Sequence, residues 1–122
     1  MHELFPATLA SVGAARRAVR RFAAELDVDL DGVMLAVTEA VANVVVHAYV
    51  DRAPGTVELS GEASAAELEL VVRDHGGGLA AGGASRGAGL GLPIIRRLAQ
   101  RVELDDAPDG VVLTMRFPRG GA

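Results

Sequence analysis

Residues 31–50, DGVMLAVTEAVANVVVHAYV, are the stretch that decides the fold of this chain. At 3.6 residues per turn, the apolar positions fall on one side of a helix, and Glu39 and Asn43 lie one turn apart on the other. The apolar positions are Leu30, Val33, Val37, Val41, Val44 and Ala48. We therefore expect a buried central helix whose opposite face presents a carboxylate and a carboxamide. Taken alone, such a pair is more often an ordinary solvated pair than a functional one.

The length and composition predict a single globular domain over residues 1–122. Half of the residues are hydrophobic but only 3% are aromatic, so we expect a core of Val, Leu, Ile and Ala with few rings to stack on bases. A net charge of −4 gives no basic footprint for nucleic acid or anionic lipid. The composition therefore favours a protein or small-molecule partner, without direct nucleic-acid or membrane binding.

The residue types that are missing exclude several kinds of chemistry. The chain has no cysteine, which excludes disulfides and thiolate metal sites. All twelve basic residues are arginine, so the lysine-dependent chemistry of P-loop enzymes, ordinary protein kinases and Schiff-base enzymes is absent. No signal-peptide pattern follows Met1, and no uninterrupted apolar run approaches the roughly 20 residues of a membrane span. We expect a cytoplasmic protein.

The spacing of apolar residues predicts alternating strands and helices. The alternation at residues 56–62 and 67–74 is typical of an antiparallel hairpin with one wet face. Four arginines of the first helix lie off its apolar stripe and are expected on a solvated face. The expected order is strand 2–6, helix 11–26, the central helix, strands 56–62 and 67–74, helix 92–101, and strands 102–104 and 111–117.

A glycine-rich segment follows the second strand of the predicted hairpin. Asp74 ends that strand and begins the pattern Asp-x-Gly-x-Gly with Gly76 and Gly78. A carboxylate there can accept a hydrogen bond from an exocyclic amine such as that of adenine, and glycine lets a flat ligand approach the backbone closely. The commoner role of an isolated Asp-Gly stretch is to support its own turn.

A second glycine-rich segment, Gly-x-Gly-Leu-Gly, leads directly into the predicted third helix. It contains Gly87, Gly89, Leu90 and Gly91. Backbone N–H groups at the start of a helix form an anion site, and glycines allow close approach of phosphate oxygens. The alternative is a flexible glycine hinge. A dinucleotide-binding fingerprint is excluded, because it needs Gly-x-Gly-x-x-Gly after a strand, and position 92 is leucine.

Together these three segments resemble the N, G1 and G2 boxes of the GHKL ATPases. The short form, with EAVANVVVHAY at residues 39–49 and GLGLPII at residues 89–95, is similar to the bacterial anti-sigma-factor serine/threonine kinases. The resemblance implies an α/β fold, a two-layer sandwich in which a mixed, mostly antiparallel sheet carries three helices on one face (the Bergerat fold). It also implies that His47 and Tyr49 are structural residues at the end of the central helix.

The resemblance implies that the chain binds ATP and Mg²⁺ and that three side chains act on the phosphates. Asn43 would coordinate Mg²⁺ through its amide oxygen, which suits an ion that takes few protein ligands when phosphates supply the rest. Glu39 would be the general base. Arg86 would reach the γ-phosphate and stabilise its charge.

The remaining positions would hold the rest of the nucleotide. Asp74 would read the adenine amino group, and Gly76 and Gly78 would form the floor of the base pocket. The residues expected to surround the phosphates are Gly87, Gly89, Leu90 and Gly91.

The same resemblance implies a kinase that sequesters a sigma factor and phosphorylates an anti-anti-sigma antagonist of the STAS type, often as a homodimer. Residues 79–86 are short and almost all Ala and Gly, so a non-catalytic, ATP-dependent protein-binding switch is the alternative. The catalytic domain of a two-component histidine kinase is disfavoured, because only one predicted helix precedes the central one, where a phosphoacceptor helix pair would be needed.

Overall fold

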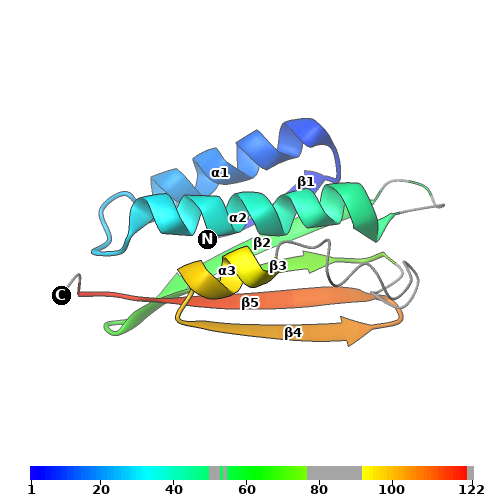
Figure 1. Cartoon of the computed structure of the whole chain (residues 1–122). Coiled ribbons are helices and arrows are strands. Elements are labelled where there is room, and N and C mark those ends of the chain that lie inside the picture. Colours follow the sequence, from blue (N-terminus) through cyan, green and yellow to red (C-terminus); the bar gives the residue numbers. More distant parts are fainter. Residues whose placement is uncertain (50–52, 54, 77–91, 121–122) are drawn as a thin grey trace.

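A five-stranded antiparallel sheet is covered on one face by three helices (Figure 1). The computed structural model describes residues 1–49, 53, 55–76 and 92–120. The strand order is β1-β2-β3-β5-β4, and all four pairings are antiparallel. The elements are β1 (His2–Pro6), α1 (Leu9–Ala23), α2 (Leu30–Asn43), the π-helix η1 (Val44–Ala48), β2 (Thr56–Ala63), β3 (Glu67–Asp74), α3 (Leu92–Leu98), β4 (Arg101–Ala107) and β5 (Gly110–Pro118). The predicted two-layer α/β sandwich is confirmed.

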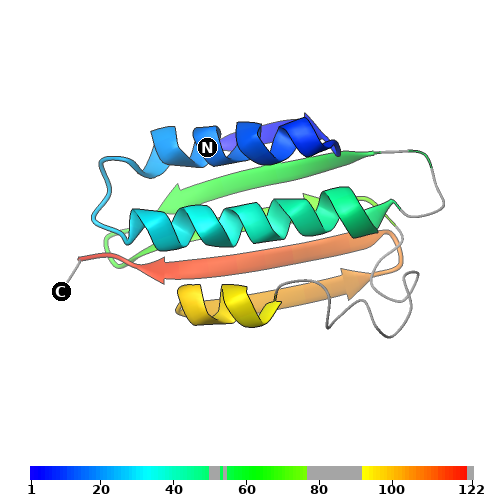
Figure 2. The same ribbon diagram turned by 45° about the horizontal axis from the view of Figure 1, so that its top comes forward.

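The central helix α2 forms the middle of the helical layer, between α1 and α3 (Figure 2). Its apolar stripe lies in the core, where Val33, Val37 and Val41 have no exposed surface. The sheet supplies the other half of the core from alternate positions of its strands, as the two-residue period predicted. Full burial of each such side chain contributes about 1.5–3 kcal/mol.

The stretch Leu30–Ala48 is also long and apolar enough, with a mean hydropathy of 1.4, to cross a membrane by those two measures. The same composition is expected of a sandwich's central helix, and this helix lies along the sheet (Figure 1). We therefore interpret its hydropathy as that of a core helix.

The central helix changes its hydrogen-bonding pattern immediately after Asn43. The sequence predicts one helix over residues 31–50, whereas the structure has an α-helix to Asn43 followed by the π-helical turn Val44–Ala48. Three consecutive valines, whose β-branched side chains are poor helix formers, begin this turn. Short π-helical segments are rare and often lie at functional sites.

Other boundaries also differ from the prediction: α1 and α3 end at Ala23 and Leu98 rather than at residues 26 and 101, and strand pairing makes β4 longer than predicted. The sequence predicts that the strand ends at residue 104, whereas β4 continues to Ala107. Asp105 and Asp106 pair with Val112 and Val111 of β5, so the ladder extends into a segment whose residues have low strand propensity. After β5, the Arg119 guanidinium contacts the Asp27 carboxylate at 2.8 Å and lowers the pKa of that carboxyl.

The hairpin between β4 and β5 touches the end of β3 through a glycine. Gly110 has φ +147°, a conformation that L side chains rarely adopt. A Cβ atom at this position would lie 2.2 Å from the backbone oxygen of Asp74. The hairpin therefore needs glycine here for both its backbone conformation and its approach to Asp74.

We predict that Gly110→Ala lowers the free energy of unfolding by about 1–3 kcal/mol, because the new methyl group would push the β4–β5 hairpin away from β3. Gly120→Ala is the control, since Gly120 also has a positive φ (+102°) but nothing lies within 4 Å of its added Cβ. Urea unfolding measures both variants. Equal losses in the two variants would show that contact with Asp74 contributes nothing.

Candidate functional site

Asp74 is a buried carboxylate at the end of β3. Only 5% of the surface of Asp74 is exposed. Oδ1 accepts hydrogen bonds from the backbone N–H groups of Gly76, at 2.9 Å, and Val111, at 3.2 Å. The turn-supporting role considered for this residue is therefore real. It also fixes a carboxylate in a buried position, which is uncommon unless its hydrogen bonds are provided.

The corner formed by Asp74, His75 and Gly76 lies against the C-terminal end of the central helix. A Cβ atom on Gly76 would lie only 2.0 Å from the backbone oxygen of Ala48, in η1. The two backbones therefore pack directly on each other, and no other residue type fits at position 76 without movement. The sequence predicts glycine here for the close approach of a ligand, and the contact that the structure describes is with the helix.

Tyr49 links the same helix end to two strands. Its hydroxyl donates to the backbone oxygen of Thr56 at 2.6 Å and accepts from the N–H groups of Thr56 and His75, both at 3.1 Å. Gly55 leaves room for the ring, because a Cβ there would lie 2.3 Å from it. The predicted structural role of Tyr49 is confirmed, and its position beside the Asp74 corner is new.

The structure brings together two of the three segments that the sequence singled out. Glu39 and Asn43 are half-buried on α2, which ends through η1 at the Asp74 corner. The central helix also packs against α3, into which the third segment leads. The remaining predicted site residues lie outside the described part of the chain: Gly78, Arg86, Gly87, Gly89, Leu90 and Gly91.

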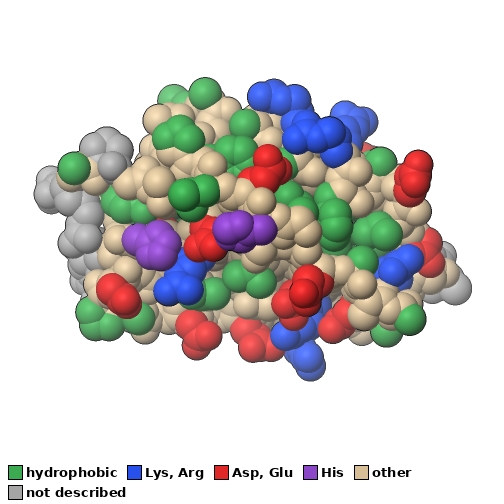
Figure 3. Space-filling model, turned by 180° about the vertical axis from the view of Figure 1, so that it is seen from behind, with side chains coloured by type: hydrophobic (Ala, Val, Ile, Leu, Met, Phe, Trp, Pro, Cys, Tyr) green, Lys and Arg blue, Asp and Glu red, His purple; other side chains and the backbone are tan. Residues whose placement is uncertain are grey.

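A cluster that sequence analysis missed lies on the open face of the sheet, where Figure 3 shows two histidines beside acidic side chains. His2 Nε2 is 2.5 Å from Glu58 Oε2, and His75 Nε2 is 3.7 Å from Glu58 Oε1. The hydrogen bond from His2, followed by the charges of His2, Arg73 and His75, lowers the pKa of Glu58. No local pattern could reveal this cluster, because β1–β2 pairing brings residues 2 and 58 together.

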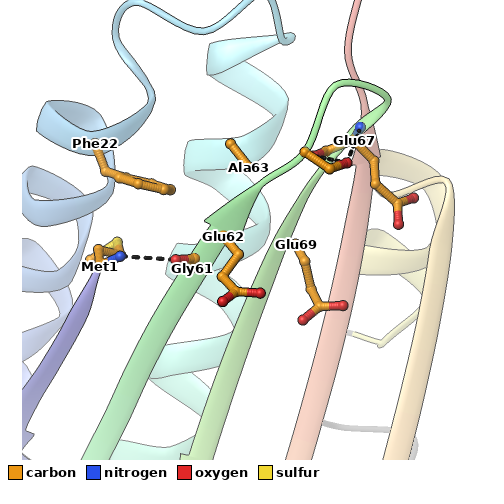
Figure 4. Close-up of a pocket in the computed structure, with 8 residues that line it drawn as sticks. Met1, Phe22, Gly61, Glu62, Ala63, Glu67 and Glu69 are labelled. Atoms are coloured by element: carbon orange, nitrogen blue, oxygen red, sulfur yellow. Dashed lines mark hydrogen bonds between the residues drawn. The ribbon is translucent and has the colours of Figure 1, made fainter.

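A hollow of about 620 Å³ lies at the opposite end of the β2–β3 hairpin from Asp74 (Figure 4). Phe22 of α1 points toward it, and the Met1 ammonium donates to the Gly61 oxygen at 2.9 Å. Glu62, Glu67 and Glu69 also line it, so it is acidic. An acidic hollow repels phosphates, and we do not assign it to a nucleotide.

The chain is similar in sequence and in fold to known proteins. Residues 5–117 match a family model described as the histidine kinase-like ATPase domain. The chain belongs to the histidine kinase-like ATPase domain family. Membership implies ATP binding, and the resemblance to the GHKL ATPases predicted from the three segments is confirmed.

Curated relatives of this histidine kinase-like ATPase domain include anti-sigma F factors. The protein from Shouchella clausii is 35% identical over 82 residues, which are 65% of this chain and 56% of that protein. The protein from Clostridium novyi is 37% identical over 68 residues, 53% of this chain and 48% of that protein. The domain therefore spans about half the length of the curated relatives it matches.

Solved structures share the fold of the domain. The RsbU and RsbW domains of a Mycobacterium tuberculosis protein match with a TM-score of 0.77 and 20% identity, covering 98% of this chain and 33% of that one. A histidine kinase domain from the Erythrobacter litoralis blue-light activated histidine kinase matches with a TM-score of 0.61 and 22% identity, covering 89% of this chain and 59% of that one.

We predict that Glu58→Gln destabilises the domain at neutral pH by less than about 1 kcal/mol, the usual range for exposed ion pairs. Because folding lowers the pKa of Glu58, its contribution is present above the unfolded-state pKa and is lost as pH falls through the folded-state pKa. Urea unfolding should therefore separate variant and wild type at neutral pH, and the difference should shrink as the pH falls below the pKa of an unfolded glutamate. Glu62→Gln, on the same strand, is the control; a Glu58→Gln loss that persists in acid would contradict the assignment.

Proposed function

We propose that this domain binds Mg-ATP beside the end of α2 and acts as an anti-sigma factor with serine/threonine kinase activity. The observation that supports this most is the buried carboxylate of Asp74, fixed at the corner where the helix bearing Glu39 and Asn43 ends. The carboxylate of Asp74, the amide of Asn43 and the carboxylate of Glu39 are therefore all attached to one junction of helix and sheet. Functional groups need such rigid support to act on a ligand together.

Asp74 recognises the adenine base in this proposal. Its buried position suits a hydrogen bond from the exocyclic amine, because a carboxylate accepts strongly where water is excluded. The bonds from Gly76 and Val111 hold that carboxylate in one orientation. Gly76 and Gly78 form the floor of the base pocket, although Gly78 lies outside the described residues.

The phosphates and the metal ion are held by residues from α2 and from the second glycine-rich segment. Asn43 offers an amide oxygen, a ligand type that suits Mg²⁺. The segment that surrounds the phosphates comprises Gly87, Gly89, Leu90 and Gly91, all beyond the described part of the chain. Arg86, in the same undescribed stretch, supplies the positive charge that lysine provides in other kinases.

Glu39 is the general base of the proposed reaction. It takes the proton from the attacking serine or threonine hydroxyl, a contribution of about 10²–10⁴-fold in rate for such groups. Bound ATP would supply the γ-phosphoryl group, with ADP as the leaving group, and Mg²⁺ would neutralise part of the phosphate charge. The position of Glu39 one helical turn before Asn43 puts base and metal ligand on the same face of α2.

The proposed partners follow from the similarity to proteins named anti-sigma F factors. One partner is a sigma factor, and the other is an anti-anti-sigma antagonist of the STAS type that receives the phosphate. We propose that residues 1–122 form one domain of a cytoplasmic protein and that two copies associate as a homodimer. If the kinase step is absent, the same fold acts as an ATP-dependent binding switch.

Asn43→Ala should weaken Mg-ATP binding at least about tenfold and remove most of its dependence on Mg²⁺, because the metal loses its amide ligand. Titration calorimetry with and without Mg²⁺ measures both effects. Gln100→Ala removes an exposed carboxamide beyond α3 and should leave binding unchanged. Failure of the wild type to bind Mg-ATP would refute the proposed function.

Glu39→Gln should reduce phosphate transfer from radiolabelled ATP to the cognate antagonist by about 10²–10⁴-fold, with little change in ATP affinity. Glu25→Gln, at an exposed glutamate after α1, is the control for the charge change. Transfer that persists at the wild-type rate would remove Glu39 from its role. ATP-dependent capture of the sigma factor without any phosphoprotein would favour the binding switch.

A further inference from the structure

The hydroxyl of Tyr49 is the point at which three chain segments near the proposed nucleotide site meet. Tyr49 follows η1, so it is attached to the helix that carries Glu39 and Asn43. Its three hydrogen bonds reach the first residue of β2 and the residue immediately after Asp74. The hydroxyl therefore joins the helix that would hold the metal to the corner that would hold the base.

Each backbone N–H of the Asp74 corner has a separate partner. The His75 N–H donates to the Tyr49 hydroxyl at 3.1 Å, and the Gly76 N–H donates to Asp74 Oδ1 at 2.9 Å. Removing the hydroxyl would leave the His75 N–H without its described partner, while the bond from Gly76 remained. The corner would then keep the bonds from Gly76 and Val111 to Asp74 and the packing of Gly76 on Ala48, and it would lose the hydrogen bond that joins it to Tyr49 at the helix end. Loss of one bond in such a network affects its neighbours as well.

The Tyr49 ring is held in place by the backbone around it. A Cβ at Gly55 would lie 2.3 Å from Tyr49 Cε1, so the ring is packed against the Gly55 backbone. Its hydroxyl satisfies both the N–H and the oxygen of Thr56, which begins β2. A rigid ring with two side-chain torsions loses little entropy when it is fixed in this way.

We propose that Tyr49 is a positioning residue for nucleotide recognition: through the His75 N–H it fixes where the Asp74 corner, and with it the carboxylate, lies relative to the helix that carries Asn43. This inference rests on the nucleotide site proposed above. A purely structural tyrosine would affect stability alone. A positioning tyrosine also determines how well the site distinguishes adenine from a base that lacks the exocyclic amine, because that discrimination depends on where the carboxylate lies.

The test compares Tyr49→Phe with the wild type in binding of Mg-ATP and of Mg-inosine triphosphate, whose base carries a carbonyl in place of the amine. Tyr49→Phe should raise the Kd for ATP about tenfold, as expected when a hydrogen bond to a charged group is weakened, and should reduce the preference for ATP over the inosine nucleotide. Thermal unfolding of each variant measures stability separately.

Ser64→Ala is the matched control. The Ser64 hydroxyl also makes three bonds to backbone groups, donating to the Glu67 oxygen and accepting from the N–H groups of Ala66 and Glu67. It lies at the opposite end of the same hairpin, and its removal should leave both nucleotide affinities unchanged. A Tyr49→Phe protein that keeps the wild-type preference for ATP, whatever its stability, would overturn the positioning role and leave the proposed function standing. Absence of ATP binding by the wild type would refute both.

A second measurement covers the case in which Tyr49→Phe does not fold. Tyr49 is the only tyrosine and the chain has no tryptophan, so tyrosine emission of the wild type reports on this residue alone. Saturating Mg-ATP should change that emission, because the corner bonded to the hydroxyl contacts the base. Emission that stays constant while calorimetry records binding would overturn the proposal.

Discussion

The direct packing of the central helix's C-terminal end on the Asp74 corner is the constraint on which the rest of the site depends. Gly76 allows the two backbones to touch at Ala48, and the Tyr49 hydroxyl bonds across the same junction. The contact at Ala48 could not form with a bulkier residue at position 76. The junction fixes a helix carrying two polar side chains against a strand end carrying a third. The junction therefore holds side chains that are distant in sequence in fixed positions relative to one another.

The same junction explains why Asp74 can be buried. A buried carboxylate is costly unless it is hydrogen-bonded, and the turn supplies one donor while the β4–β5 hairpin supplies another. Gly110 lets that hairpin approach the backbone of Asp74. Support of the local turn and recognition of a ligand are thus not competing roles. The bonds that stabilise the turn also hold the carboxylate in place.

The two faces of the sheet carry different kinds of side chain. The face under the helices is apolar and holds the core, in which residues of β2, β3 and β5 pack against α2. The open face carries charges arranged in local networks, such as Glu58 between two histidines and Arg116 among Glu67, Glu69 and Glu103. The Arg116 and Glu58 side chains in these networks are half-buried. The central helix and the core face establish the fold.

The sequence by itself determined the helices, the strand pattern and the family, because apolar periodicity and the spacing of three glycine and polar segments are local properties. It also identified Asp74, Glu39 and Asn43 as candidates. Only the tertiary structure decided that Gly76 packs on Ala48, that Tyr49 bonds to His75, and that Glu58 lies between His2 and His75. It likewise decided the extension of β4 and the π-helical turn after Asn43. These features arise from contacts between segments far apart in the chain, and no local pattern encodes which backbone groups will meet when the layers pack.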